Sequence, residues 1–225
     1  MEGTIISLNV GKPADVEHQG KIVSTGINKS PVETRLFLSA INFEGDGQAD
    51  LKFHGGVDKA VCVYCYEHYP YWQQELERPL SFGAFGENVT VTGMLEPDVH
   101  IGDTFQLGDA VVQISQPRQP CYKLSVKYGK PDMPLKVQNA GYTGYYFRVL
   151  QEGFVSKDSR LVRIERDPNG VTIEYANRIM HHDKQDQDGI RRILAVSALS
   201  ASWRKTLEKR LDGQETDTKE RLSGV

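Results

Sequence analysis

Cysteine is scarce in this sequence: only three of its 225 residues are cysteines. An odd number this small argues against a framework of disulfide bonds, with which small secreted domains compensate for a limited core. It also falls short of the four thiolates that hold an ordinary iron–sulfur cluster. If the protein carries out redox chemistry, its electrons must therefore come from another protein or from a soluble reductant.

Long apolar runs and an excess of basic residues are also missing. No stretch reaches the roughly 18 to 20 apolar residues that cross a membrane, and the N-terminus lacks the basic segment and cleavage site of a signal peptide. The chain has 27 basic and 30 acidic side chains, a formal net charge of −3, whereas nucleic-acid-binding domains are usually basic. We therefore expect a cytoplasmic protein that binds neither a nucleic-acid polymer nor a membrane.

The first two-thirds of the chain is expected to be rich in β-structure. Short runs of β-branched and aromatic residues recur there, separated by glycine and aspartate. The expected strands are 4–9, 35–38, 61–66, 88–92, 104–107, 110–116, 144–149 and 161–165. Gly108-Asp109 is a hairpin turn signal between two of these strands. Many short strands at even spacing predict a closed or nearly closed barrel, with short helices inserted at 67–77 and 123–129.

The pattern changes after residue 165, where amphipathic helices replace the strands. Thr172, Asp186 and Ser200 are each placed to cap the N-terminus of a helix. About 40 residues of helix would be marginal alone, so this module should pack on the barrel or on a partner. The sequence thus predicts a mixed, mainly β fold with a barrel domain over 1–165, a small three-helix module over 166–212 and a flexible polar tail over 213–225.

Cys121 is the residue that most directly indicates chemistry. It ends the segment Pro117-Arg118-Gln119-Pro120-Cys121, directly after an expected strand. The two prolines restrict the loop, and the cations of Arg118 and Lys123 favour the thiolate, the form that ligates metals and attacks electrophiles. A soft thiolate suits a soft metal–sulfur centre. The residues alone leave open whether Cys121 is such a ligand or a small buried apolar side chain.

A long glycine-rich loop over residues 43–60 leads into the expected strand at 61–66. Loops of this length inside compact domains are usually functional. Its glycines would permit a close approach of the backbone to a ligand, and its cations would surround an anion such as a phosphate. These residues are Gly55, Gly56, Lys52, His54 and Lys59. The alternative is a solvated loop whose charges have no common function.

Two further segments place polar side chains in or beside strands. Glu87 and Asn88 follow a glycine-rich turn, where they could read the edge of a heterocycle; alternatively, Asn88 is a turn residue. Arg148 lies within an aromatic strand, and a buried arginine needs an anionic partner. A bound phosphate and an internal carboxylate, such as Glu87 or Asp103, would serve equally well.

Cys62 and Cys65 have the spacing of a CxxC pair. Residues three apart in a strand point to opposite faces of the sheet. No second pair of cysteine or histidine residues at zinc spacing occurs in the sequence. The pair is therefore not expected to ligate one metal.

Taken in order, these segments form a recognisable series. The motifs are GDGQAD (45–50), HGGVDKAV (54–61), FGEN (85–88), PRQPC (117–121) and GYYFRV (144–149), followed by the expected helices of 171–211. The series resembles the MOSC domain, the type found at the C-terminus of molybdenum cofactor sulfurases, in its YiiM-like branch with a C-terminal three-helix (3-alpha) domain. Each motif alone is weak, but the ordered series is specific and covers nearly the whole chain.

The resemblance implies a MOSC-type β-barrel that binds the molybdenum cofactor, molybdopterin. The family cysteine, matched by Cys121, would ligate molybdenum. The residues that would hold the pterin and its phosphate, or lie near them, are Lys59, Arg118, Arg148, His54, Gly55, Gly56, Glu87 and Asn88.

The resemblance also implies an activity. Family members of the reductase type reduce N-hydroxylated compounds, such as N-hydroxylated purine bases, with electrons from a separate redox protein. The implied function is therefore that of a molybdenum-dependent oxidoreductase in detoxification. Three alternatives stay open: a non-catalytic carrier or sensor of the cofactor or of sulfur, a metal-free thiol enzyme with His54 as base, and a structural module that docks a partner. The sequence leaves open the physiological substrate, the electron donor and whether the chain forms a homodimer.

Overall fold

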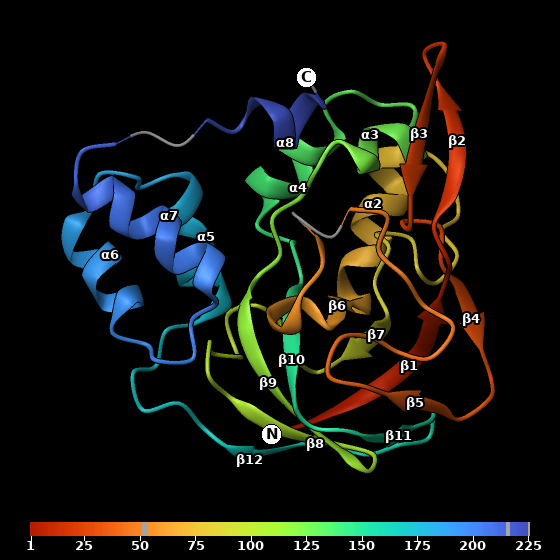
Figure 1. The fold of residues 1–225 in the computed structure, drawn as a ribbon, viewed down its shortest axis with the longest axis horizontal. Helices are drawn as coiled ribbons and strands as arrows, with labels where there is room; N and C mark the ends of the chain where they lie inside the picture. The colour runs from red at the N-terminus through yellow and green to blue at the C-terminus, as the bar shows by residue number, and fades with distance from the viewer. Residues whose placement is uncertain (51–53, 215–216, 225) are drawn as a thin grey trace.

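The computed structural model describes residues 1–50, 54–214 and 217–224; Lys52, one of the cations named above, lies outside them. A β-barrel forms the centre, and helices flank it on two sides (Figure 1). The strands are β1 (Glu2–Val10), β2 (Ala14–His18), β3 (Lys21–Thr25), β4 (Ser30–Val32), β5 (Leu36–Leu38), β6 (Val61–Cys65), β7 (Val89–Thr92), β8 (Thr104–Leu107), β9 (Ala110–Pro117), β10 (Tyr145–Gln151), β11 (Gly153–Val155) and β12 (Leu161–Glu165). The helices are η1 (Val57–Lys59), η2 (Tyr66–His68), α2 (Tyr69–Leu76), α3 (Lys123–Tyr128), α4 (Met133–Ala140), α5 (Ile173–His181), α6 (Gln187–Leu194), α7 (Ala201–Leu211) and α8 (Lys219–Ser223).

The barrel is closed by seven strands. Their order is β12-β8-β9-β10-β6-β7-β1, and β1 pairs back to β12. Strands β6 and β7 run parallel, while the other pairs around the barrel are antiparallel. The predicted turn at Gly108-Asp109 joins β8 to β9, where Leu107 pairs with Ala110. The expected barrel with inserted short helices is thus confirmed.

Several small elements were not expected from the sequence, among them the β2–β3 hairpin, β4, η1, β11 and α4. The hairpin is mostly exposed along both strands, and Ile22 in it is 69% exposed, so no buried apolar face marks it in the sequence. Strand β11 has only three residues and pairs with the equally short β5. Among the described helices, none combines the length and the apolar character that a bilayer crossing requires.

The three-helix module consists of α5, α6 and α7. Each predicted cap accepts the backbone N–H three residues further on, at 3.0 Å for Thr172 Oγ1, 2.9 Å for Asp186 Oδ1 and 3.3 Å for Ser200 Oγ. These bonds satisfy N–H groups that a helix N-terminus otherwise leaves free. The sequence therefore predicted correctly where all three helices begin.

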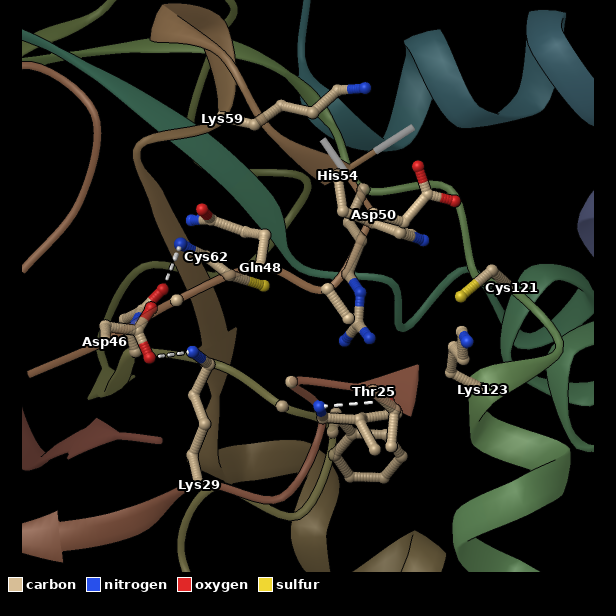
Figure 2. Close-up of a pocket in the computed structure, with 18 of the residues that line it drawn as sticks. Thr25, Lys29, Asp46, Gln48, Asp50, His54, Lys59, Cys62, Cys121 and Lys123 are labelled. Atoms are coloured by element: carbon tan, nitrogen blue, oxygen red, sulfur yellow. Dashed lines mark hydrogen bonds and ion pairs between the residues drawn. The ribbon is translucent and has the colours of Figure 1, made fainter. Parts of the chain in front are cut away.

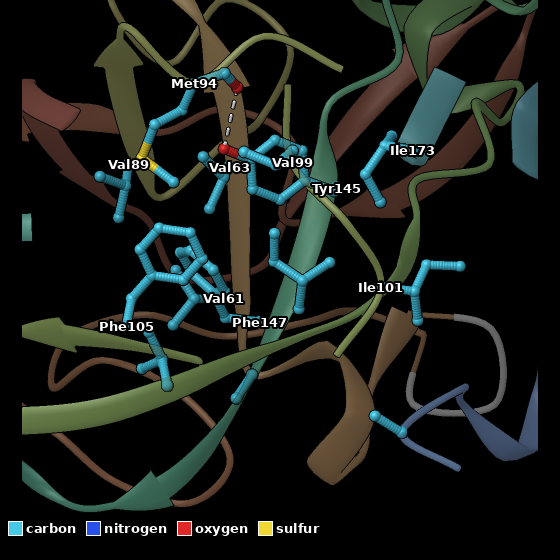
Figure 3. Close-up of a cluster of buried hydrophobic side chains, with 14 of the residues drawn as sticks. Val61, Val63, Val89, Met94, Val99, Ile101, Phe105, Tyr145, Phe147 and Ile173 are labelled. Atoms are coloured by element: carbon cyan, nitrogen blue, oxygen red, sulfur yellow. Dashed lines mark hydrogen bonds between the residues drawn. The ribbon is translucent and has the colours of Figure 1, made fainter. Parts of the chain in front are cut away.

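The barrel and the module share one apolar core (Figure 3). A single cluster of buried side chains includes Val61, Phe105 and Phe147 of the barrel and Ile173 and Trp203 of the module. Each large apolar side chain contributes about 1.5 to 3 kcal/mol when fully buried. The three helices, marginal by themselves, are therefore stabilised by packing on the barrel.

The expectation of a flexible polar tail needs a correction at residues 217–224, which contain α8. Figure 1 shows this helix beside α3 and α4, at some distance from α5–α7. The backbone N–H of Tyr122 donates to the Arg221 carbonyl at 2.8 Å. Because hydrogen bonds of this kind, rather than an apolar face, hold α8 in place, the polar sequence gave no sign of the contact.

Candidate functional site

A pocket lies beside the barrel where several loops meet (Figure 2). It contains about 590 Å³ of empty space, a figure that includes open solvent. Five of the residues singled out from the sequence line it together: Cys121, His54, Lys59, Arg118 and Asn88. The structure thus brings the cysteine and the glycine-rich loop to one place, although they are far apart in the sequence.

Cys121 is only 6% exposed and lies just before α3. Its burial acts to raise the pKa of the thiol, because burial disfavours the charged form. The charge of His54 and its hydrogen bond to the sulfur outweigh this, with help from the Lys123 backbone N–H and the Arg118 cation, and lower the pKa of Cys121 to about 7. The thiolate, which is the metal-ligating form, is therefore accessible near neutral pH.

This lowered pKa predicts the pH dependence of alkylation. Because the thiolate forms as the pH rises through the pKa, Cys121 should react half-maximally with iodoacetamide near pH 7. Burial raises the pKa of Cys62 in the same pocket to about 11, so Cys62 should stay unmodified and serve as an internal control. Mass spectrometry of the separate peptides measures both.

In His54→Ala the pH midpoint for alkylation of Cys121 should move up toward the ordinary cysteine value of about 8.5. A wild-type midpoint already at that value would contradict the assignment.

Arg118 brings a buried cation to the same pocket. Its backbone N–H donates to the Gly144 carbonyl at 3.0 Å, and its side chain hydrogen-bonds the Tyr146 hydroxyl. Within the described part of the chain, however, its buried Nη1 has no hydrogen-bond partner. Leaving such a donor unsatisfied costs about 1 to 3 kcal/mol, and more for a charged group. The free guanidinium nitrogen therefore fits an anionic ligand in the pocket.

The side of the pocket across from Cys121 is built by a polar network (Figure 2). Lys29 Nζ pairs with the buried Asp46 carboxylate, which also accepts the Gly11 backbone N–H at 3.0 Å. Asn88 Nδ2 donates to Asp46 Oδ2 at 2.8 Å, and Asn88 Oδ1 accepts the Cys62 N–H at 3.0 Å. Asp46 was visible in the motif GDGQAD, whereas no signal in the sequence singled out Lys29.

Glu87 lies inside the fold and does not line the pocket. Its carboxylate accepts hydrogen bonds from the Tyr69 hydroxyl, from the backbone N–H groups of Gly83 (3.1 Å) and Phe85 (2.9 Å) and from the Thr90 hydroxyl (3.0 Å). It thus holds the loop that contributes Phe85 and Gly86 to the pocket wall. This geometry does not support a role for Glu87 in binding the cofactor.

Arg148 has an internal carboxylate as partner, and that carboxylate is Asp58 rather than Glu87 or Asp103. Its Nη2 lies 2.7 Å from Asp58 Oδ1, and Asp58 Oδ2 accepts the Ala201 backbone N–H at 3.0 Å, at the start of α7. Arg148 does not line the pocket. It therefore supports the pocket indirectly, because it fixes Asp58, the residue next to Lys59.

Gly55 and Gly56 also lie outside the pocket lining. Gly56 has φ +93 and immediately precedes η1. Because L side chains rarely adopt this conformation, the glycine serves the turn that leads to Asp58 and Lys59. The sequence therefore correctly predicted backbone freedom at Gly56. The geometry does not support direct contact between this glycine and a ligand.

The two cysteines of β6 point to opposite sides, as the strand geometry predicted. Cys62 lines the pocket, whereas the Cys65 thiol donates to the Met94 carbonyl at 3.1 Å inside the core. Cys65, His68 and Glu96 lie with their potential ligand atoms within 4.8 Å of one another. His68 Nε2 and Glu96 Oε2 are already hydrogen-bonded at 2.7 Å, so this cluster is satisfied internally.

Comparison with known proteins agrees with the fold. Residues 50–162 match the model of the MOSC domain, and residues 171–214 match that of the YiiM-like, 3-alpha helix domain. The chain therefore belongs to the MOSC-domain family, and its C-terminal helices place it in the YiiM-like branch, as the motifs had indicated.

Individual relatives support the same assignment. The Bacillus subtilis protein YflK is 54% identical over 209 residues, which make up 93% of this chain and 95% of YflK. The crystal structure of YiiM from Geobacillus stearothermophilus has a TM-score of 0.80 at 41% identity, covering 93% of this chain and 99% of that one. A protein of Gibberella moniliformis named as a reductase is 34% identical over 168 residues, covering 73% of this chain and 30% of its own length.

Proposed function

We propose that this protein is a cytoplasmic, molybdenum-cofactor-dependent reductase that detoxifies N-hydroxylated compounds such as N-hydroxylated purine bases. The observation that carries the proposal is one pocket that combines the low-pKa thiol of Cys121 with the unpartnered guanidinium nitrogen of Arg118. A thiolate is a suitable ligand for molybdenum, and a buried cation suits the cofactor phosphate. Membership of the MOSC family and the reductase-named relative favour the same function.

Different residues of the pocket would bind different parts of the cofactor. Cys121 would ligate the metal, and Arg118 and Lys59 would bind the phosphate. Burial lowers the pKa of Lys59, while Asp58 and Asp50 act to raise it, so the loop acids help to keep this side chain cationic. In the free site, His54 stabilises the Cys121 thiolate through its charge and a hydrogen bond.

When bound, the cofactor would supply two-electron reduction of the substrate. Reduction of an N–OH group takes up two electrons and two protons and yields N–H and water. A separate redox protein would deliver the electrons, since the chain has too few cysteines for an ordinary cluster of its own.

The test is turnover by molybdenum-loaded protein. Incubated with an N-hydroxylated purine and a reduced electron donor, the loaded protein should form the corresponding amine, measured by chromatography, and Cys121→Ala prepared in parallel should not. Loaded wild-type protein that leaves the base unreduced with a competent donor would overturn the reductase proposal. Such a result would favour a non-catalytic carrier or sensor, which shares the binding site but needs no electrons.

The hydrogen bond between His54 and Cys121 favours one other candidate, a metal-free thiol enzyme. In that case His54 would act as base and Cys121 as nucleophile. Activity would then persist in protein from cells unable to make the cofactor, and alkylation of Cys121 would abolish it. The same substrate assays, repeated with metal-free protein, separate the two candidates.

A further inference from the structure

Arg221 of α8 holds the peptide groups on both sides of Cys121. Its Nη1 donates to the Pro120 carbonyl at 2.5 Å, and its own carbonyl accepts the Tyr122 backbone N–H at 2.8 Å. One residue thus bridges the neighbours that precede and follow the cysteine. Pro120 and Arg221 are 101 positions apart, so this contact is a product of the tertiary fold.

The rest of the surroundings fixes Arg221 in this position. Its Nη2 donates to Gln138 Oε1 at 2.8 Å, which links the guanidinium to α4. Gly224 ends α8 with φ +76 and lies against the Tyr122 ring, so close that a Cβ on it would come within 2.9 Å of that ring. Helix α8 therefore docks on the Cys121 loop through side chain, main chain and ring contacts.

The charge of Arg221 also bears on the sulfur. Burial acts to lower the pKa of Arg221, and the nearby Cys121 thiolate acts to raise it. The other cations that act on the sulfur are His54 and Arg118, and the pocket wall also carries Lys123 and the Asp50 carboxylate. Arg221 differs from these groups because it bonds the main chain on both sides of Cys121.

The geometry points to Arg221 as a positioning residue of the Cys121 site: it clamps the loop at Pro120 and Tyr122 and places a cation beside the thiolate. Helix α8 is then part of the cofactor site, and Gln138 is the anchor that orients the clamp. This inference deepens the proposed function and rests on it for the cofactor, but the clamp itself acts on the cysteine and is testable without molybdenum.

The test is alkylation of Cys121 by iodoacetamide across a pH series, in metal-free protein of full length, followed on the Cys121 peptide by mass spectrometry. Arg221→Ala should raise the limiting rate roughly fivefold, the factor expected for one lost hydrogen bond that restrains local opening. Arg221→Lys keeps the charge but loses the paired bonds, so its limiting rate should rise as well, which separates the clamp from the charge.

Lys219→Ala is the matched control, because Lys219 is an exposed cation on the same helix. It should leave the limiting rate unchanged. A limiting rate in Arg221→Ala that equals the wild-type rate would overturn the inference, even if the variant unfolds at a lower temperature. Molybdenum content is measured separately: wild-type protein without metal would count against the proposed cofactor function, while the alkylation result would still decide the role of Arg221.

Discussion

Replacing Cys121 by alanine should remove molybdenum from the protein. In wild-type protein purified from cells able to make the cofactor, we expect a metal content near one per chain, and in Cys121→Ala a content close to zero. The thiolate is the direct metal ligand in the proposed site, and the remaining pocket cations hold only the phosphate. Elemental analysis of the two proteins, purified in parallel, measures the difference.

Cys62→Ala is the matched control for this experiment. Cys62 lines the same pocket and is equally little exposed, at 6%, but burial raises its pKa to about 11, so it stays a protonated thiol at neutral pH. Molybdenum should therefore remain bound in Cys62→Ala. Retention of the metal in Cys121→Ala, or equal loss in both variants, would contradict ligation by Cys121.

The second large effect is on stability: Glu87→Ala should lower the free energy of unfolding by about 3 to 4 kcal/mol. The change leaves four donors, two of them backbone N–H groups, without their acceptor. Each buried unsatisfied group costs about 1 to 3 kcal/mol, and water entering from the adjacent pocket relieves part of this. Urea unfolding measures the loss as a lower midpoint at an unchanged slope.

Tyr69→Phe gives the scale for this prediction, because it removes one of the four donors and keeps the ring. Its cost should be about 1 kcal/mol. If Glu87→Ala were no more destabilised than Tyr69→Phe, the carboxylate would not be the organiser of the loop over Gly83–Gly86. In that case a direct role of Glu87 toward a ligand would regain support.

The barrel and the three helices could be predicted from the sequence because their signals are local. Strand β9 alternates apolar and polar residues, and the caps Thr172, Asp186 and Ser200 need only the next three residues to act. Cys121 could be singled out for a similar reason, since two prolines and two cations surround it in the sequence itself. These local signals do not depend on how the rest of the chain folds.

The partners of buried charges could not be predicted in the same way. Whether Arg148 meets a phosphate or an acid depends on which loop the fold brings to it, and Asp58 lies 90 positions away. Three of the four donors to Glu87 lie within four residues of it, but the turn that directs them at its carboxylate is not visible in the sequence. Arg221 escaped notice because a helix held by hydrogen bonds has the composition of a solvated tail.

The bond between Asp58 and the start of α7 limits how the two parts of this protein can be recombined. One oxygen of Asp58 binds Arg148 of the barrel and the other binds the Ala201 N–H of the helical module. Because that donor is a main-chain N–H, a chimera that joined this barrel to foreign helices would keep the bond only if the first helix residue met Asp58 in the same position, one residue from Lys59. The barrel and the module are therefore not interchangeable parts, and exchanges between relatives should keep η1 and the first turn of α7 as a matched pair.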